Sequence, residues 1–473
     1  MTAGSVPRRY AVVGTGARAA LYIDALAGPY AATAAVTAWC EPNRIRMDYY
    51  DQALANAGRP APARYRPDEF GRLLDKQRPD AVIVTSPDCT HAEYAAQALE
   101  SGCDVILEKP VATTPDGARQ LAAAAAAAAG GTLTVGFNYR YAPRNSALRQ
   151  LIAAGTIGGV TSVHFEWALD TVHGADYFRR WHRDKSASGG LLVHKASHHF
   201  DLVNWWIADL PATVYARGAL RFYGDKNARA LGLPARPERS AGSPGLQTDP
   251  FALDLAADST LRRLYLEAES EDGYLRDRDV FSPGITIEDN LAVLVTYRSG
   301  VFLTYSLNAH SPWEGYRVTV NGDAGRAELE VVERGYVGAV SAGGIMGRLA
   351  VDPMVSGPEA GTAVGTAGGT AVGAATSADG GEGDARPVGQ RLLVQRHWEP
   401  AREVPIPAAD GPHAGGDAPL LESVFGAVTT PDPLGRRAGY ADGLASAAIG
   451  LAANESIASG SVVDVASLRI LPG

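Results

Sequence analysis

Residues 9–28, which read RYAVVGTGARAALYIDALAG, decide the fold of this 473-residue chain. The apolar run 10–13 leads directly into a Gly14-x-Gly16-x-x-Ala19 turn, and a helical pattern follows the turn. A glycine turn between a strand and a helix leaves backbone N–H groups and the positive end of the helix dipole facing a ligand, which suits a pyrophosphate. The stretch therefore predicts the first βα unit of a dinucleotide-binding sheet.

The alternation of short β-rich runs and helical runs continues to about residue 155. Strands are expected at 10–14, 35–40, 81–85, 104–107 and 133–136, with helices near 17–28, 44–57, 91–101 and 115–129. Strands that alternate with helices in this way are typical of a doubly wound parallel sheet. We therefore expect residues 1–155 to form an α/β, NAD-binding domain of the Rossmann type.

From about residue 156 the pattern changes to longer strands in which apolar and polar residues alternate. This period-two pattern is typical of a sheet with one buried face. Residues 156–473 are thus expected to form an α+β domain with a large, mostly antiparallel sheet, serving substrate binding and oligomerisation. Within it we expect strands such as 160–169, 214–222 and 291–297, an arginine- and acid-rich insertion at 225–282, a flexible Gly/Ala-rich loop at 355–389, and a C-terminal helix at 440–459.

The composition is that of an ordinary globular protein, with 46% hydrophobic and 20% charged residues. The net charge of −9 and the interspersed acidic and basic residues argue against nucleic acid as a partner. No apolar run approaches the roughly 20 residues that span a bilayer, so we expect no membrane partner. The three cysteines, Cys40, Cys89 and Cys103, do not suggest a disulfide framework, and we expect a cytoplasmic location.

Glu41, at the end of the second expected strand, bears on the choice of cofactor. A carboxylate there can accept hydrogen bonds from ribose hydroxyls and disfavours a 2′-phosphate, which favours NAD over NADP. Arg44 and Arg46 could instead pair with a 2′-phosphate, although we expect both on the solvated face of the next helix. NAD is thus the predicted cofactor, and NADP stays open.

Several further motifs follow in order along the chain. They are Thr85-Ser86-Pro87 with His91, Glu108-Lys109-Pro110, Gly136-Phe137-Asn138-Tyr139-Arg140, and the segment from Gly189-Gly190 to Asp201. Together with the glycine turn they resemble the Gfo/Idh/MocA family of oxidoreductases, over residues 9 to about 335. The resemblance implies a nicotinamide-dependent dehydrogenase that transfers hydride to or from a secondary hydroxyl or ketone of a sugar, sugar acid or cyclitol.

The resemblance also implies positions for the cofactor and for a catalytic lysine. Lys109, in the family's E-K-P motif, would lie beside the nicotinamide and touch the reacting oxygen, where an ammonium stabilises alkoxide character. The expected cofactor contacts are Gly14, Gly16, Ala17, Arg18, Glu41, Ser86, Pro87, His91, Glu108, Lys109 and Asn138.

The family usually presents Gly-Gly-x-x-x-Asp-x-x-x-His in its second domain, with the acid and the histidine near the substrate. The corresponding residues here are His194 and His198, so the histidine is kept and the acid is replaced. His198 is the expected general acid and base, because an imidazole changes charge near neutral pH. His194 could take part in the proton relay or orient His198, and Lys195 could supply charge in place of the acid.

Four residues are expected to contact the substrate: Arg140, Trp181, Lys195 and His199. An aromatic face and charged hydrogen-bonding groups suit a sugar ring. Lys195 and His199 are also four residues apart. An error of one residue in matching the motif would therefore assign the site positions to Lys195 and His199 instead of His194 and His198. No metal site is expected, because Lys195 stands beside His194 and would repel a cation.

Two other functions stay open from the sequence alone. One is that of a redox glycosidase, a family variant that oxidises a sugar transiently, eliminates the glycosidic bond and then restores the hydride. The other is that of a sensor that binds a dinucleotide without turnover, which the replacement of the acid by His194 would favour. Release of NADH would distinguish a dehydrogenase from the redox glycosidase, which releases none. Replacement of Lys109 would distinguish an enzyme, which should lose turnover while still binding cofactor, from a sensor.

The charges at the expected site suggest an anionic ligand. Lys109, His194, Lys195, His198 and Arg140 would together bias the pocket towards a uronate, a sugar acid or a sugar phosphate. For the assembly we expect a homodimer or homotetramer, since open-faced sheets in this family commonly pair two subunits.

Overall fold

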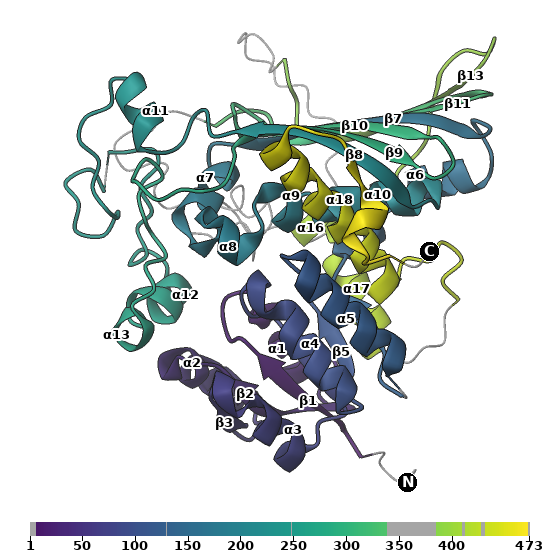
Figure 1. Ribbon diagram of the computed structural model, residues 1–473. Helices are drawn as coiled ribbons and strands as arrows, with labels where there is room; N and C mark the ends of the chain where they lie inside the picture. Colours follow the sequence, from purple (N-terminus) through teal and green to yellow (C-terminus); the bar gives the residue numbers. More distant parts are fainter. Residues whose placement is uncertain are drawn as a thin grey trace, which may run out of the picture.

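A computed structural model of the chain describes residues 6–128, 130–246, 248–337, 385–408, 412–426 and 431–471. It has two domains, each built on its own sheet, and helices of the second domain lie between the two sheets (Figure 1). The predicted loop at 355–389 falls almost wholly outside the described residues. No helix in the described ranges combines the length and apolar character needed to cross a bilayer.

The first sheet is parallel, with strand order β3-β2-β1-β4-β5-β6, and the short strand β15 joins it antiparallel beside β6. Its strands are β1 (Arg8–Val13), β2 (Ala34–Cys40), β3 (Ala63–Tyr65), β4 (Ala81–Val84), β5 (Asp104–Leu107), β6 (Leu133–Val135) and β15 (Ala438–Gly439). The helices are α1 (Ala19–Ala27), α2 (Arg44–Asn56), α3 (Phe70–Gln77), α4 (His91–Glu100) and α5 (Pro115–Ala127). Strand order reverses between β1 and β4, and ligands of such sheets bind at this point, outside the carboxyl ends of the strands.

The second sheet has nine strands in the order β14-β13-β12-β11-β7-β10-β9-β8-β16, all paired antiparallel except β7 with β10. They are β7 (Val160–Asp170), β8 (Pro211–Ala219), β9 (Asn290–Tyr297), β10 (Phe302–Ser311), β11 (Glu314–Gly322), β12 (Gly325–Arg334), β13 (Gly389–Arg396), β14 (Arg402–Glu403) and β16 (Val463–Asp464). Burial alternates residue by residue along β9 and β10, because one face packs on helices and the other is open.

Short helices and turns carry the chain across the buried face of this sheet. They are η3 (Asn138–Tyr141), α6 (Pro143–Ala153), α7 (His173–Arg179), η4 (Trp181–Arg183), α8 (Lys185–Ser188), α9 (Leu191–His194) and α10 (Ser197–Ile207). The long C-terminal helix α18 (Tyr440–Ser459) packs against β8 and α10. Gly450 permits a close approach of α18 to α9, because a Cβ there would lie 2.6 Å from the carbonyl oxygen of Leu192.

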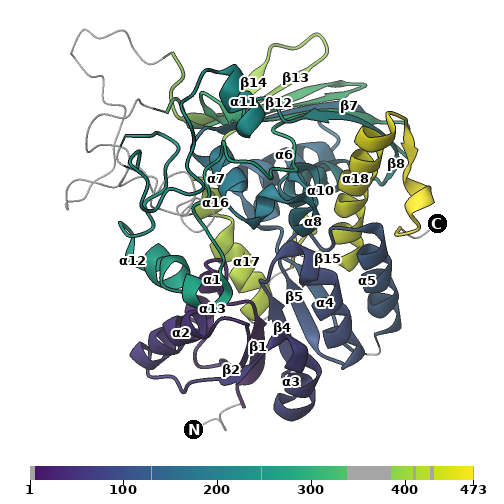
Figure 2. The same cartoon turned by 60° about the vertical axis from the view of Figure 1, so that its left-hand side comes forward.

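The segment between β8 and β9 leaves the second sheet and reaches the first domain (Figure 2). It contains α11 (Asp225–Ala230), α12 (Ser259–Leu261), η5 (Arg262–Leu266) and α13 (Glu269–Asp272). The contact is specific: Nε of Arg46 on α2 donates to the carbonyl of Leu264 at 3.0 Å, and Nδ2 of Asn43 donates to that of Ala268 at 2.9 Å. We call residues 225–282 the insertion.

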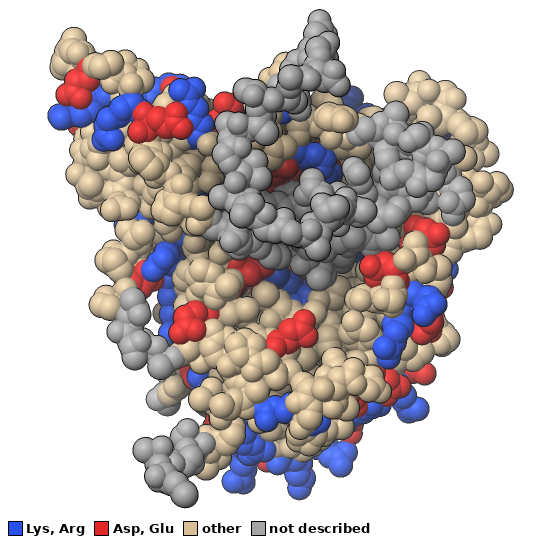
Figure 3. All heavy atoms as spheres, turned by 180° about the vertical axis from the view of Figure 1, so that it is seen from behind, with Lys and Arg blue, Asp and Glu red and all other residues tan. Residues whose placement is uncertain are grey.

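A second C-terminal segment also returns to the first domain. It consists of the turn labelled α16 (Pro412–Gly415) and helix α17 (Asp417–Phe425). The ring of Phe425 packs on Tyr10 and Tyr22, at 5.4 and 6.4 Å between ring centroids. Acidic and basic side chains are mixed over the face in Figure 3, without a continuous basic stripe among the described residues in view.

Candidate active site

A cavity of about 500 Å³ lies at the carboxyl ends of β1, β2, β4 and β5, facing α9 and α10. Fourteen of the residues predicted from sequence line it: Gly14, Gly16, Ala17, Arg18, Glu41, Ser86, Pro87, His91, Glu108, Lys109, Asn138, Trp181, His194 and His198. Other lining residues were not predicted, among them Asp88, Arg180, Tyr265 and His413.

The glycine turn is shaped to hold a pyrophosphate. Gly14 has φ of +84°, and a Cβ there would lie 2.6 Å from the Cα of Ser86, so the two loops approach closely only because Gly14 has no side chain. The buried Oγ1 of Thr15 has no hydrogen-bond partner in the described part of the chain. With helix α1 starting at Ala19, the turn fits the phosphates of a dinucleotide.

Glu41 lies at the cavity wall, where it is bound on both carboxylate oxygens. Oε2 accepts from the backbone N–H of Thr15 at 2.8 Å, and Oε1 accepts from that of Asn43 at 3.0 Å. Oε2 keeps capacity for a further donor such as a ribose hydroxyl, whereas Oε1 also accepts from Nη1 of Arg46 at 3.5 Å.

The expectation that Arg46 lies on a solvated helix face is wrong. Its side chain is buried, and Nη1 lies 2.7 Å from Asp272 and 3.5 Å from Glu41. The insertion causes this burial, because it covers α2 and contributes Asp272, Tyr265 and Tyr274 to the cavity. Tyr265 also accepts the backbone N–H of Ala17 through its hydroxyl at 3.0 Å.

The E-K-P strand end is anchored by Glu108. Its Oε1 accepts from Nε of Arg18 and from the hydroxyl of Tyr22, each at 2.7 Å. Burial by itself would raise the pKa of Glu108, but Arg18 and Tyr22 lower it below its usual value. The bonds from Arg18 and Tyr22 hold Glu108 in place after β5, and the next residue, Lys109, lines the cavity.

Lys109, His194 and Asp88 form a hydrogen-bonded chain at the cavity wall. Nζ of Lys109 donates to the carbonyl of His194 at 3.1 Å and lies 3.4 Å from its Nε2. Nδ1 of His194 lies 2.5 Å from Oδ2 of Asp88, so one proton lies between these two atoms. Asp88 directly follows Thr85-Ser86-Pro87, and the sequence reasoning missed it.

The pKa values of Lys109 and Asp88, the two ends of this chain, are moved towards neutrality. Burial lowers the pKa of Lys109 to about 8, although Asp88 and Glu108 oppose this shift. Burial raises the pKa of Asp88 well above its usual value, and burial with nearby Lys109 lowers that of His194. A chain whose ends titrate nearer to neutral pH can take up and return a proton.

His198 lies beside this chain and lines the cavity. Its Nδ1 makes no hydrogen bond to any residue that the structure describes, and its ring stacks on that of Tyr139 at 4.4 Å. Burial, followed by the charge of Lys109, lowers the pKa of His198 well below its usual value. The imidazole is therefore neutral and suited to hydrogen bonding rather than to holding a proton.

Arg140, Lys195 and His199 lie outside the cavity lining, contrary to the expected substrate contacts. Arg140 is bound by Asp201, with Oδ1 at 2.6 Å and Oδ2 at 2.8 Å. Lys195 donates to the hydroxyl of Tyr139 at 3.2 Å, and His199 pairs with that of Tyr305 at 2.7 Å.

The helical geometry explains why His194 and His198 lie at the cavity while Lys195 and His199 do not. Successive side chains point in different directions around a helix, so the pair at 194 and 198 faces the cavity while that at 195 and 199 faces the second sheet. Ring stacking of His199 on Trp167 at 4.0 Å places it there. We assign Arg140, Lys195 and His199 to packing.

The C-terminal segment adds an unforeseen pair, His413 and Asp417. Oδ1 of Asp417 accepts from Nδ2 of Asn138 at 2.7 Å, and Oδ2 lies 2.8 Å from Nδ1 of His413. Burial favours a raised pKa for Asp417, but His413, Arg18 and Asn138 bring it down to about 2. Their spacing of four residues was the one sequence signal, far from the recognised motifs.

Groups of three or more potential metal-ligating side chains with suitable geometry are absent from the described residues. The cavity therefore combines a glycine turn, a carboxylate at the end of β2, a hydrogen-bonded chain of titratable groups and neutral imidazoles. This set of groups suits hydride transfer between a nicotinamide and a hydroxyl-bearing carbon.

Comparison with known proteins identifies the family. Residues 8–137 match the oxidoreductase family's NAD-binding Rossmann fold, and residues 149–354 match its C-terminal α/β domain. The oxidoreductase YteT of Bacillus subtilis is 39% identical over 269 residues, which cover 55% of this chain and 62% of that protein. The inositol 2-dehydrogenase of Rubrobacter xylanophilus is 29% identical over 151 residues, or 31% of this chain and 39% of that enzyme.

The aligned part of the chain thus spans less than two thirds of the length of either relative. Among solved structures, levoglucosan dehydrogenase in complex with NADH and levoglucosan superposes with a TM-score of 0.59 at 17% identity, covering 97% of this chain and 100% of that one. This likeness concerns the fold. Fold, motif order and both matched domains agree: the chain belongs to the Gfo/Idh/MocA family of oxidoreductases.

Proposed function

We propose that the protein is an NAD-dependent dehydrogenase that acts on a secondary hydroxyl or ketone of a sugar, sugar acid or cyclitol. The observation that carries this proposal is the chain from Lys109 through His194 to Asp88, which lines the cavity beside the uncharged His198. Asp88 supplies the carboxylate that the Gly-Gly segment lacks, and it does so from the first domain.

In the oxidation direction, Lys109 would hold the reacting oxygen and take its proton. The proton can then pass to Nε2 of His194 while the proton on Nδ1 moves to Asp88, so the chain gains one proton and the substrate loses one. His198, which lines the cavity, would position the hydroxyl through its imidazole. Bound NAD supplies the hydride acceptor, and the reverse steps protonate the oxygen during reduction.

The charges around the ribose position favour NAD over NADP. Two carboxylates, Glu41 and Asp272, face the single guanidinium of Arg46. The excess negative charge disfavours a 2′-phosphate, whereas Glu41 can accept from ribose hydroxyls. The glycine turn and Asn138 would complete the contacts with the dinucleotide.

A sugar or cyclitol fits the other end of the cavity. Trp181 stacks on His182 at 3.6 Å between ring centroids, and the two rings offer a flat face next to several hydrogen-bonding groups. Relatives named inositol 2-dehydrogenase and a similar fold that binds levoglucosan and NADH support this substrate class.

Location and assembly stay predictions. A reducing cytoplasm is consistent with the three free cysteines, Cys40, Cys89 and Cys103. Pairing of two subunits through the open face of the second sheet is consistent with the exposed side chains of Leu294 and Phe302.

The test is NADH formation on a panel of cyclitols, neutral sugars, sugar acids and glycosides, with free reducing sugar measured in parallel. We expect NADH with one configuration, and none from the variant Lys109→Met, which should still bind NAD. Sugar release without net NADH would instead favour the redox glycosidase, and NAD binding without turnover on any compound would favour a sensor.

A further inference from the structure

The C-terminal segment 412–417 lies against η3 at the wall of the active-site cavity. A Cβ at Gly416 would lie 2.4 Å from the carbonyl oxygen of Asn138, so the two main chains can approach this closely because Gly416 has no side chain. His413 and Ala414 have φ of +52° and +54°, a left-handed conformation that residues with a Cβ rarely adopt. Strain of this kind persists where the surrounding structure holds it in place, and it clusters at ligand-binding sites.

Asp417 binds two side chains that line the cavity, those of Asn138 and His413. Although burial would raise the pKa of Asp417, its partners hold it at about 2, so the carboxylate is ionised near neutral pH. An ionised carboxylate only accepts, and Asn138 and His413 must therefore donate to it, through Nδ2 and Nδ1. These bonds fix the orientation of the amide and of the imidazole ring.

The other polar side-chain atom of each residue is an acceptor. Oδ1 of Asn138 is buried and makes no hydrogen bond to a residue that the structure describes. Nε2 of His413, at the tip of the ring, makes none to the described residues either, and it accepts when the ring is neutral with its proton on Nδ1. A buried acceptor without a donor is costly, so this wall favours a ligand that brings N–H or O–H groups.

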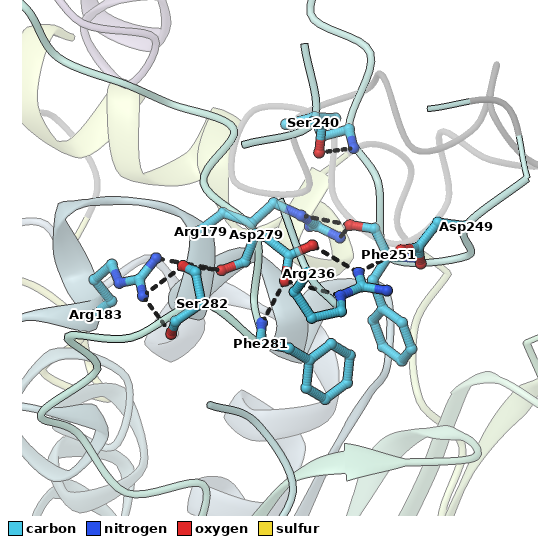
Figure 4. Close-up of polar contacts among 10 residues, drawn as sticks. Arg179, Arg183, Arg236, Ser240, Asp249, Phe251, Asp279, Phe281 and Ser282 are labelled. Carbon is cyan, nitrogen blue, oxygen red and sulfur yellow. Dashed lines mark hydrogen bonds and ion pairs between the residues drawn. The ribbon is translucent and has the colours of Figure 1, made fainter. Parts of the chain in front are cut away.

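The insertion shows the opposite situation. It contains a second cavity, of about 640 Å³, whose wall includes Arg236, Asp249 and Asp279. Arg236 is paired with both carboxylates, and the guanidinium of Arg179 donates to the carbonyl of Phe251 at 2.8 Å (Figure 4). These charged groups are satisfied within the protein, whereas the two acceptors at the active-site cavity are not satisfied by any described residue.

The nicotinamide of the cofactor carries a matching group. Its carboxamide ends in an NH2 group with two N–H donors, and Asp417 holds two side chains with an unbound acceptor each among the described residues. A sugar hydroxyl has a single donor and would satisfy one of these acceptors. The number of donors therefore favours the cofactor over the substrate as the partner of this wall.

We propose that His413 is a cofactor-binding residue, which together with Asn138 accepts the N–H groups of the nicotinamide carboxamide, and that Asp417 positions both. The proposal rests on the proposed use of NAD and adds a contact from the C-terminal segment. A bound carboxamide would fix the rotation of the nicotinamide ring, and so the face that the ring presents to Lys109.

The experiment measures binding by calorimetry, without turnover. The protein is titrated with NAD, with the acetylpyridine analogue of NAD, in which a methyl group replaces the carboxamide NH2, and with ADP-ribose, which has no nicotinamide. We expect the unaltered protein to bind NAD about tenfold more tightly than the acetyl analogue, as for the loss of hydrogen bonds to buried acceptors. In His413→Phe this ratio should drop to about three or less, while the affinity for ADP-ribose stays the same. His413→Gln, whose amide oxygen can accept in place of Nε2, should retain part of the ratio.

The control is His397→Phe, which removes an exposed histidine that does not line the cavity and should keep the full ratio. Because the ratio compares two ligands of one variant, a general loss of affinity cancels. Equal binding of NAD and the acetyl analogue, or a ratio that survives His413→Phe, would overturn the proposal, and so would a ratio that persists while sugar affinity falls. Failure to bind NAD at all would refute the proposed function as well, whereas NAD binding without turnover would leave the role of His413 standing.

Discussion

The two ends of the cavity differ in how their charges are compensated. In the cofactor half, formed by the glycine turn, Glu41, Arg46 and Asp272, each cation lies against at least one carboxylate. In the substrate half, formed by Lys109, His194, Asp88, His198 and Arg180, the lysine is buried with a lowered pKa and has no carboxylate as a direct hydrogen-bond partner among the described residues, its partner being His194. Cofactor binding needs charges that are paired and stay fixed, whereas proton transfer needs groups whose charge can change.

The largest effect on catalysis is expected at Lys109, in the substrate half. We expect Lys109→Met to lower kcat about a thousandfold, because it removes both the charge at the reacting oxygen and the first member of the proton chain. NAD affinity, measured by calorimetry, should stay the same because the cofactor half is untouched. Lys76→Met, on an exposed face of α3, is the matched control. A kcat within a few-fold of the unaltered protein would contradict the role of Lys109.

Asp88→Asn should have the next largest effect, about a hundredfold in kcat. The amide keeps the shape of the side chain but cannot take the proton from Nδ1 of His194. Asp75→Asn, at an exposed position, serves as the control. Unchanged kcat with intact NAD binding would show that His194 does not pass a proton to Asp88.

The sequence predicted the cofactor half better than the substrate half for a physical reason. Gly14, Gly16 and Glu41 lie within one βαβ unit, where local spacing fixes their positions. The role of Asp88 depends on its contact with His194, 106 residues further along the chain, and such a contact leaves no periodic signal in the sequence.

The same limit applies to the insertion and the C-terminal segment. The burial of Arg46 depends on a carbonyl more than two hundred residues away, and Asp417 meets Asn138 across a similar separation. The type of each element, by contrast, follows from short-range patterns, so the predicted α/β and α+β sheets are confirmed.

Asp417 links Asn138 to His413 of the C-terminal segment, and its effect should be on stability. Its pKa is lowered to about 2, so the unfolded chain binds more protons as the pH falls from about 4. The stabilisation is present above about pH 4 and amounts to about 2 kcal/mol that is lost on approaching about pH 2. In Asp417→Asn, urea unfolding should show a correspondingly smaller loss over this range. An unchanged acid dependence would contradict the assignment.

The smallest expected effect lies in the cofactor half. Glu41→Ala removes one of the two carboxylates near the ribose, so NADP should gain about tenfold in affinity relative to NAD. Turnover at saturating cofactor should change little, because the substrate half is intact. If both cofactors bind as before, Glu41 does not set the preference.

The most direct test of the account is the pH dependence of ketone reduction, measured as kcat/KM on the sugar identified by NADH formation. Reduction needs the proton on Lys109, so the rate should fall as the pH rises through about 8. Asp88→Asn should move this fall to lower pH, because the charge of Asp88 raises the pKa of Lys109. A rate that does not change between neutral and alkaline pH, or a fall that Asp88→Asn leaves in place, would contradict proton transfer through Lys109, His194 and Asp88.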